Sequence, residues 1–415
     1  MICVGEPKVY DVGNSSRLSA NISYNGENKE FYFEIPSEYK KYLCTEVSDA
    51  FLVGIFNYAV SLNEDIKFEG KISERLLYQF RTYFIPTLAN NRKGYSNIKI
   101  IAEPFEKTIQ SEGVAATSAS GGVDSFYSIV RHLEDVPERY KVSHLLIVNQ
   151  FNRYVDEKIT RKRFDTVAGK AEKIAVDFGL KIIPMYTNHH EFHYTGFVTE
   201  YSLRICSYAL ALQKLIAVYY VSSGVPFHEF TFESHDTDGM DIFNLSMMTN
   251  DNISFYSSGG EVVRTEKLKY ICKHPGVQKN MHVCNYNDEE NCSECEKCMR
   301  TMVTLDVLGD LEFYKDVFNL EKYRKNRNKY LCTVESYEFE SSHEILDAIR
   351  EYNYHVPIGI IIYGRTIRRF GLFIKHIIGK SQWIRNMYYK LKIDFIVKGK
   401  KHAIIDRYGT KYQID

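Results

Sequence analysis

Six residues, Ser120 to Ser125 (SGGVDS), stand between a short apolar run and an amphipathic pattern. Consecutive glycines where a strand turns into a helix let backbone N–H groups approach a ligand closely. The positive end of the following helix favours a phosphate, and Asp124 can hold Mg²⁺ against phosphate oxygens. The segment therefore predicts a phosphate site for ATP and Mg²⁺, made of Ser118, Ser120, Gly121, Gly122, Val123, Asp124 and Ser125.

This loop is not a Walker A loop, because no lysine follows the glycines and the required spacing is absent. A phosphate-binding loop without a lysine is suited to hold the β- and γ-phosphates of ATP as a leaving group, with the α-phosphate exposed to attack. The only other stretch that looks similar, 377–381 (IIGKS), has Ile374 where the first glycine of a Walker A loop should stand. We therefore exclude that second stretch.

Four cysteines, Cys284, Cys292, Cys295 and Cys298, lie within fifteen residues in the order C-x7-C-x2-C-x2-C. The two C-x-x-C steps let thiolates converge on one ion, and four sulfurs suit a structural Zn²⁺. An iron–sulfur cluster is the second interpretation, and Cys272 or His282 is an alternative first ligand. In a reducing compartment Cys3, Cys44, Cys206 and Cys332 are expected to be buried structural thiols.

The hexapeptide resembles the pyrophosphate loop of the PP-loop ATPases, the adenine nucleotide α-hydrolase-like group. In that group ATP adenylates a carboxyl or carbonyl oxygen, pyrophosphate leaves, and a nitrogen or sulfur nucleophile displaces AMP. The loop together with the later cysteines resembles 7-cyano-7-deazaguanine synthase of the queuosine pathway, over about residues 113–305. The resemblance implies a parallel-sheet, HUP-like nucleotide-binding domain with a zinc site, and catalytic roles for Asp124, Ser125 and Arg300.

The chain also departs from that synthase family. Residues 262–271 (VVRTEKLKYI) occupy the place of the family's lysine-containing helix, and Arg300 occupies that of its post-cysteine arginine. The segments that would contact the substrate match too loosely to carry residues over, and both ends of the chain are extended. The chain therefore resembles a larger relative of that synthase, one that keeps the ATP chemistry and can act on a different substrate.

Alternating short strands and helices over about 109–310 predict a parallel α/β sheet. We expect strands at 113–119, 142–151, 181–188 and 229–236, with a long apolar helix at 202–224. Parallel sheets bind ligands at the carboxyl ends of their strands. The loop at 120–125, Asn149, Asn188 and Ser234–Asp236 are therefore expected to face one cleft.

Two further domains are expected to flank this one. Residues 1–108 predict a small α+β domain, with a hairpin at 17–36 that turns at Asn25-Gly26. Residues 311–415 predict a mostly helical extension. Its last part, 364–415, holds thirteen Lys or Arg against three Asp, so it is a candidate surface for RNA, DNA or acidic lipid. The alternative is a helix pair with an apolar face docked on the body and solvated cations.

The composition is that of a globular protein, with 44% hydrophobic residues and 53 basic against 53 acidic residues. A chain with zero formal charge is not built as a whole to bind polyanions. No apolar run reaches the length of a membrane span, and the N-terminus lacks a signal-peptide core. We therefore expect a cytoplasmic protein without a membrane span.

Weaker candidates lie in the loops of the predicted sheet. The histidines of NHHEFH, namely His189, His190 and His193, are candidates for metal binding or proton transfer, with surface histidines as the alternative. Arg204 and Arg264 are candidates for the α-phosphate or a substrate carboxylate, with structural ion pairs as the alternative.

The sequence leaves three candidate functions for the chain. The first is an ATP-consuming C–N ligase that adenylates a carboxylate for attack by ammonia or an amine. The second is a tRNA-modifying sulfurtransferase, which requires a redox-active cysteine in the cleft. The third is a scaffold that binds ATP without turnover and recruits nucleic acid through the basic C-terminal segment.

Overall fold

The computed structural model describes residues 1–134, 136–149, 157–192, 197–232, 237–336, 340–380, 404–405 and 411–412. The chain divides into two compact units, Met1–Met281 and His282–Asp415. This division differs from the three domains expected with boundaries near 108 and 310. The reason is that the N-terminal strands continue the parallel sheet, so no boundary separates them from it.

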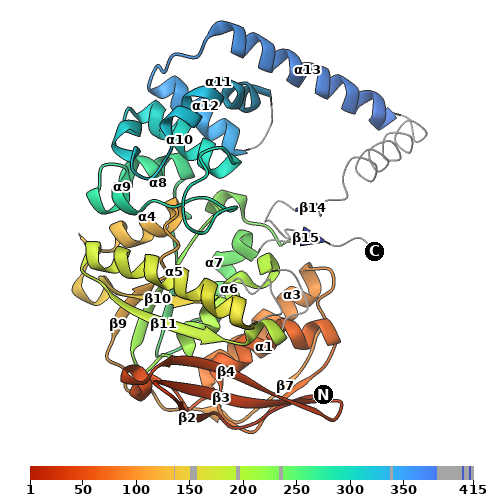
Figure 1. The fold of residues 1–415 in the computed structure, drawn as a ribbon. Helices are drawn as coiled ribbons and strands as arrows, with labels where there is room; N and C mark the ends of the chain where they lie inside the picture. Colours follow the sequence, from red (N-terminus) through yellow and green to blue (C-terminus); the bar gives the residue numbers. More distant parts are fainter. Residues whose placement is uncertain are drawn as a thin grey trace. The chain divides into compact units, whose positions relative to one another are not determined.

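The first unit is built on a mixed sheet that has eleven strands in the part of the chain described (Figure 1). One half is parallel, in the order β13-β12-β9-β10-β11. The strands of this half are β9 (Val114–Thr117), β10 (Val142–Val148), β11 (Lys181–Thr187), β12 (Ile216–Ser222) and β13 (Ser254–Ser258). The predicted parallel α/β sheet is confirmed.

The strand order reverses at β9. From β9 the chain adds β10 and β11 on one side and then returns to add β12 and β13 on the other. In open parallel sheets the crevice for ligands lies outside the carboxyl ends of the strands at such a reversal. The segments that follow β9 and β12 therefore border the expected binding crevice of this unit.

The other half of the sheet comes from the first hundred residues. Strand β4 (Glu27–Pro36) pairs antiparallel with β11 on one edge and with β3 (Ser15–Tyr24) on the other. Asn25 and Gly26 join β3 to β4 with φ angles of 49° and 81°, the left-handed values that tight hairpins require. The predicted hairpin is confirmed. The remaining strands of this half are β1 (Ile2–Val4), β2 (Lys8–Val12), β5 (Ile66–Phe68) and β7 (Ile100–Ile101).

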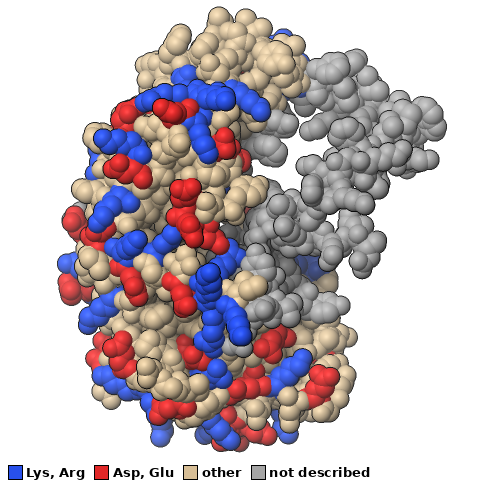
Figure 2. Space-filling model, in the orientation of Figure 1, with Lys and Arg blue, Asp and Glu red and all other residues tan. Residues whose placement is uncertain are grey.

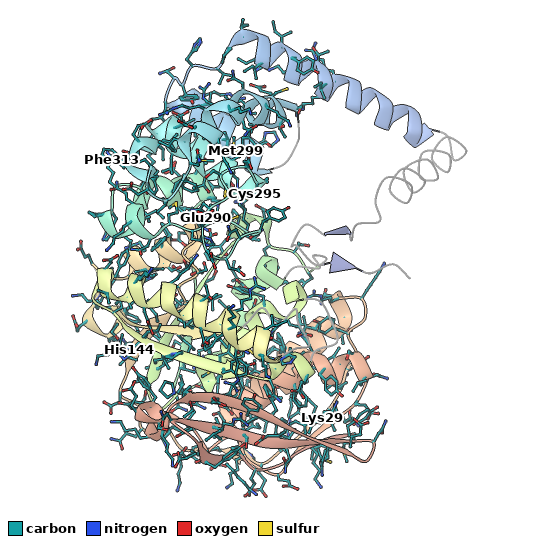
Figure 3. The ribbon with its side chains drawn as sticks, in the orientation of Figure 1. Lys29, His144, Glu290, Cys295, Met299 and Phe313 are labelled. Carbon is teal, nitrogen blue, oxygen red and sulfur yellow. The ribbon has the colours of Figure 1, made fainter. Side chains whose placement is uncertain are left out.

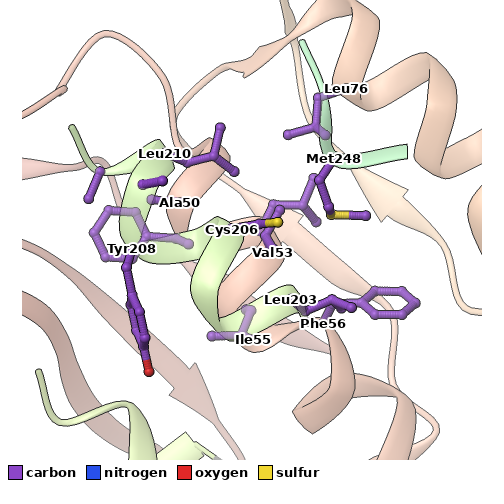
Figure 4. Close-up of a cluster of buried hydrophobic side chains, with 14 of the residues drawn as sticks. Ala50, Val53, Ile55, Phe56, Leu76, Leu203, Cys206, Tyr208, Leu210 and Met248 are labelled. Atoms are coloured by element: carbon purple, nitrogen blue, oxygen red, sulfur yellow. The ribbon is translucent and has the colours of Figure 1, made fainter. Parts of the chain in front are cut away.

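The helices of the first unit pack on the sheet or on one another. They are α1 (Asp49–Leu62), α2 (Glu74–Gln79), α3 (Ile85–Asn91), α4 (Val123–Arg131), α5 (Glu157–Phe178), α6 (Phe197–Leu210), α7 (Asp241–Met248), α8 (Arg264–Ile271) and α9 (Pro275–Asn280). Figure 4 shows how α1 and α6 share one core, with Val53 and Phe56 beside Leu203 and Cys206. One continuous core therefore joins the N-terminal segment to the parallel sheet.

Two predicted elements were wrong. The helix expected at 202–224 ends at Leu210, and residues 216–222 (IAVYYVS) form β12 instead. Residues 230–232 of the expected fourth strand lie outside any strand, and residues 233–236 lie outside the described residues. An unbroken apolar run does not distinguish a buried helix from a buried strand. Here the β-branched and aromatic side chains of 216–222 settle the choice, because they pack well on a pleated surface.

Gly54 of α1 permits the close contact between α1 and its neighbours. A Cβ atom at Gly54 would lie 2.6 Å from Cε1 of Phe31 and 2.8 Å from Oγ of Ser207. We expect Gly54→Ala to lower the free energy of unfolding by roughly 1–3 kcal/mol through overpacking. The measurement is urea unfolding followed by circular dichroism.

The control for Gly54 is Gly169, which lies in α5, where an added Cβ atom would meet no other atom within 4 Å. Gly169→Ala should be neutral or stabilise by up to about 1 kcal/mol, since alanine favours the helix. Equal effects of the two substitutions would contradict the packing argument.

The second unit is helical in its described part, apart from the short antiparallel pair β14 (Ile404–Ile405) and β15 (Lys411–Tyr412). Its main helices are α10 (Glu296–Leu308), α11 (Leu320–Ser336), α12 (Glu340–Glu351) and α13 (Ile358–Lys380). Asp306 of α10 accepts hydrogen bonds from the hydroxyls of Tyr323, at 2.6 Å, and Tyr354, and pairs with Nε of Arg327 at 3.1 Å. These contacts join α10 to α11 and to the segment before α13. Across the described residues, the helices are all too short or too polar to cross a bilayer.

Candidate functional site

The glycine loop lies where the sequence predicts it, between the end of β9 and the start of α4. Gly121 has a φ of 77°, which a residue with a side chain adopts only with strain. Gly122 is the N-cap of α4 and supplies no side-chain hydrogen bond to the helix. The first N–H groups of a helix lack partners within the helix, so this glycine leaves them open to an anion.

The two serines of the loop hold its shape. The hydroxyl of Ser125 donates to the carbonyl oxygen of Gly122 at 3.1 Å and accepts from the hydroxyl of Ser120 at 3.2 Å. The N–H of Gly122 donates to Oγ of Ser120 at 3.3 Å. Ser125 is buried, whereas Ser120 is exposed. Ser125 therefore supports the loop from its buried side, and Ser120 is the serine that solvent reaches.

Asp124 lies between two cations of α8. One carboxylate oxygen pairs with Nη1 of Arg264, and the other pairs with Nζ of Lys267 at 3.1 Å. Burial by itself would raise the pKa of Asp124, but the positive charges of Arg264 and Lys267 outweigh it and lower this pKa below the usual carboxyl range. Asp124 is therefore ionised, and the cluster of one carboxylate and two cations carries a net positive charge.

Lys267 is the most constrained member of this cluster. Its side chain is 2% exposed, and its Nζ also donates to the carbonyl oxygen of Ser223 at 2.7 Å, directly after β12. Gly259, which follows β13, has a φ of 90°, and a Cβ there would lie 2.9 Å from Cε of Lys267. The ends of β12 and β13 thus leave a space that fits the lysine. One buried ammonium group connects these strand ends to the loop after β9.

A second polar contact flanks the lysine. The hydroxyl of Tyr127, on α4, donates to Oε1 of Glu261 at 2.9 Å, and the other oxygen of Glu261 accepts from the N–H of Gly259 at 3.0 Å. Burial and the hydrogen bond to Glu261 raise the pKa of Tyr127 to about 12. Tyr127 therefore stays protonated at neutral pH and fixes the segment that follows β13 against α4.

The ion pairs of Asp124 predict a pH-dependent stability. Asp124→Asn leaves Arg264 and Lys267 without their shared counter-charge, so we expect a loss of roughly 1–3 kcal/mol in the free energy of unfolding at pH 7. Because the folded-state pKa of Asp124 is lowered, its contribution is complete above the unfolded pKa and is lost as the pH falls toward the folded one.

The deficit of Asp124→Asn relative to the wild type should therefore shrink below about pH 4. Urea unfolding of both proteins at neutral and acidic pH measures it. A deficit that stays the same over this range would contradict the ion-pair explanation.

The cysteine cluster lies in the second unit. The Sγ atoms of Cys284, Cys292, Cys295 and Cys298 all lie within 4.8 Å of one another, and those of Cys292 and Cys298 are 3.9 Å apart. Four sulfurs bound to one tetrahedral ion at Zn–S distances of about 2.3 Å would be roughly 3.8 Å apart. The cluster therefore fits a single ion such as zinc, more closely than a cage in which each thiolate binds its own iron.

Backbone N–H groups point at the sulfurs in the way that thiolates require. The N–H of Cys295 donates to Sγ of Cys292 at 3.3 Å, that of Cys298 to Sγ of Cys295 at 3.5 Å, and that of Tyr286 to Sγ of Cys284 at 3.4 Å. The side-chain hydrogen bond with Cys298 is the main cause that lowers the pKa of Cys295 to about 5, and the backbone N–H of Cys298 adds to this effect. These donors stabilise negative charge on sulfur, so the chemistry of the cluster agrees with its geometry.

The cluster is also built into the helices of its unit. Cys295 is the N-cap of α10, and Figure 3 shows Cys295 and the buried Met299 close together there. Asn291, between the cysteines, accepts from the N–H of Val283 at 2.8 Å and donates to the carbonyl oxygen of Val317 at 3.0 Å. An ion at this site would therefore fix the start of α10 to the segment before α11.

Arg300, the third predicted catalytic residue, lies on α10, and its Nε is 3.6 Å from Oε1 of Glu296. It belongs to the second unit, whereas Asp124 and Ser125 belong to the first. Its predicted catalytic role stays a prediction.

The two asparagines expected at the cleft serve the sheet. The side chain of Asn149 bonds both the N–H and the carbonyl oxygen of Thr187, at 2.8 and 2.9 Å, and so continues the pairing of β10 with β11. Asn188 accepts from the N–H of Tyr32 at 3.0 Å and donates to the carbonyl oxygen of Glu30 at 2.7 Å, across to β4. These contacts account for both amides structurally.

Among the histidine and arginine candidates, His189 and Arg204 also make structural contacts. His189 is buried beside Phe31, and its Nε2 lies 2.8 Å from the carbonyl oxygen of Gly54. Arg204 is buried within α6, and its Nε donates to the hydroxyl of Tyr208 at 3.3 Å. Arg264 alone lies at the loop. His193 and Ser234–Asp236 lie outside the described residues, as does most of the basic segment 364–415.

Lys267 is the residue that the sequence interpretation missed. The resemblance places a lysine-containing helix at 262–271, but this segment holds two lysines, Lys267 and Lys269, and the resemblance does not select one of them. The signal that selects Lys267 is helical periodicity: it lies three residues after Arg264, on the same face of α8. Comparisons of the chain with protein-family models, curated proteins and solved structures found no match.

Proposed function

We propose that the chain is an ATP-dependent adenylating enzyme that releases pyrophosphate and activates a carboxylate for attack by ammonia or an amine. The observation that carries this proposal is the triad of Asp124, Arg264 and Lys267 beside an uncapped helix start at the strand reversal. Such a site offers N–H groups and two cations to a polyphosphate. It also offers one carboxylate, which is a ligand that Mg²⁺ prefers.

The roles of the residues follow from their positions. The N–H groups at the start of α4 and the hydroxyl of Ser120 would hold the pyrophosphate that leaves. Arg264 and Lys267 would neutralise charge that develops on the phosphates, which is the main way a protein assists such a transfer. An anion that draws these two cations would free Asp124 to hold Mg²⁺, whose charge assists departure of the pyrophosphate.

Three of the four thiols of the first unit are buried, which disfavours the sulfurtransferase alternative; the fourth, Cys3, is half-buried on β1. Cys44 and Cys206 are buried, and burial raises the pKa of both thiols. Cys272 is also buried, and its Sγ donates to the carbonyl oxygen of Lys269 at 3.4 Å. Buried thiols with raised pKa values are poor nucleophiles. The buried cysteines of the first unit therefore agree better with the ligase function than with the sulfurtransferase function.

The test is the release of AMP and pyrophosphate from ATP. Candidate deazapurine and protein carboxylates are supplied with ammonia and Mg²⁺, and both products are measured for the wild type and for Asp124→Ala. We expect AMP and pyrophosphate in equal amounts from the wild type with a carboxylate, and a loss of both in the variant.

Two results would count against the proposal. If no carboxylate elicits either product while ATP still binds, the chain is a nucleotide-binding scaffold. If the variant releases as much as the wild type, the loop does not carry the reaction.

A further inference from the structure

Helix α13 exposes apolar side chains on the second unit. Ile358, Ile362, Tyr363 and Ile367 are 74%, 61%, 64% and 42% exposed, although they lie within ten residues of one helix. Single exposed apolar residues are common, but such a group on one helix marks an interaction surface. Figure 2 shows uncharged surface at the top of the view, where Figure 1 places the first turns of α13.

The contact of α13 with α11 does not cover this group. Gly364 faces α11 so closely that a Cβ there would lie 2.6 Å from Cβ of Glu335 and 3.0 Å from the carbonyl oxygen of Cys332. Arg365 pairs with Glu335 at 3.2 Å. On the next side of the helix, Tyr363 and Ile367 line an open groove of about 540 Å³ between α11 and α13. The apolar side chains thus lie beside the helix contact and outside it.

The sequence of α13 extends the same pattern over its whole length. Apolar residues recur at 363, 367, 370, 374 and 377, the spacing of one face of a helix. From 358 to 380 the helix has five cations and no acidic residue; the cations are Arg365, Arg368, Arg369, Lys375 and Lys380. On a helix of 3.6 residues per turn, Arg365, Arg368 and Arg369 fall on the side opposite Tyr363 and Ile367, and Ile358 and Ile362 lie closer to these cations. The helix is amphipathic and purely basic.

We propose that α13 is a membrane-binding helix that lies in the surface of a bilayer rich in anionic phospholipid. An amphipathic helix with an apolar face and a cationic face buries the first among acyl chains and keeps the second near anionic headgroups. The helix does not span the bilayer, because its apolar content is too low for that. This inference goes beyond the proposed reaction and does not depend on it.

Charge and side-chain type favour a lipid surface over the other occupants. A second copy of α13 packed on the recurring apolar face would leave the cations on the opposite side without anionic partners. Single-stranded nucleic acid binds through aromatic side chains on which bases stack, whereas three of the four exposed apolar residues are isoleucines. A lipid surface satisfies both the aliphatic side chains and the cations.

The test is flotation of the full chain with vesicles. We expect the protein to float with vesicles of phosphatidylcholine and phosphatidylserine, to stay behind with phosphatidylcholine alone, and to be released by salt. Tyr363→Asp with Ile367→Asp, both on the recurring apolar face, should lower the bound fraction more than about tenfold. Arg368→Gln with Arg369→Gln should lower it by about tenfold or more, at the contribution expected per cation.

Two variants serve as controls. Phe313 is equally exposed in the same unit, at 62%, and Phe313→Asp should float as the wild type does. Lys267→Met should also float normally, which separates membrane binding from the nucleotide site. Circular dichroism shows that each variant is folded.

Three results would overturn the inference. One is a wild type that stays behind with anionic vesicles at low salt. Another is equal flotation of the wild type and the variant with aspartates at 363 and 367. The third is binding of a labelled RNA oligonucleotide, lost in the arginine variant, by a protein that does not float.

Discussion

Lys267→Met should lower the rate of pyrophosphate release by at least about a hundredfold, the loss typical of a preorganised charge at a reacting group. Methionine fills nearly the same space as lysine but carries no charge. Of the two cations that pair with the carboxylate of Asp124, only Arg264 then remains. It also removes the hydrogen bond to the carbonyl oxygen of Ser223, so the end of β12 loses its link to the loop. The steady-state release of AMP and pyrophosphate measures the effect.

Lys269 provides the matched control, since it lies on the same helix and its side chain is 40% exposed beside Glu266. Lys269→Met should change the rate by no more than about twofold, as expected for a surface charge. Equal losses in the two variants would indicate a general effect of charge on α8. An unchanged rate in Lys267→Met would remove this lysine from the reaction.

Loss of the metal ion should unfold the start of the second unit. The four cysteines connect the segment from Cys284 to Cys298 with the start of α10, and a structural zinc ion contributes on the order of 10 kcal/mol to the folding of such a site. We expect one zinc ion per wild-type chain and a clearly lower zinc content in Cys298→Ser, because the substitution removes one thiolate from the closed set of four that a structural site requires. Zinc content is measured by mass spectrometry.

Cys332→Ser is the control, because Cys332 lies on α11 and outside the cluster. It should keep its zinc, and its thermal unfolding should resemble that of the wild type. Chelation of the wild type should reproduce the early unfolding of Cys298→Ser and expose the segment after His282 to protease. Full zinc content in Cys298→Ser, or unchanged unfolding after chelation, would show that this cluster does not hold the ion.

The features that the sequence predicted well are local ones. The glycine loop and the cysteine cluster each lie within about fifteen residues, so their residue types and spacing suffice to define them. The hairpin at Asn25-Gly26 is local in the same sense, because the φ angles of its turn depend on two residues. Short-range chemistry of this kind is encoded in the order of neighbouring residues.

The features that were missed depend on distant contacts. Lys267 matters because Asp124 and Ser223 surround its ammonium group, and these two residues lie 143 and 44 positions away. Asn149 and Asn188 follow strand ends as expected, but their side chains form hydrogen bonds with backbone groups of neighbouring strands. A sequence shows that a polar residue follows a strand; it does not show which partner is closest.

The β4–β11 pairing has a consequence for synthesis of the chain on the ribosome. Strand β4 finds its neighbour only when Thr187 has emerged, 155 positions after Tyr32, whose carbonyl oxygen it then binds. At ordinary rates of translation that interval lasts roughly ten seconds or longer. Until then the nascent hairpin presents an open strand edge with Phe31 and Phe33, the kind of surface that attracts other chains. The newborn protein therefore passes through a stage in which a chaperone has a binding site that the finished protein lacks.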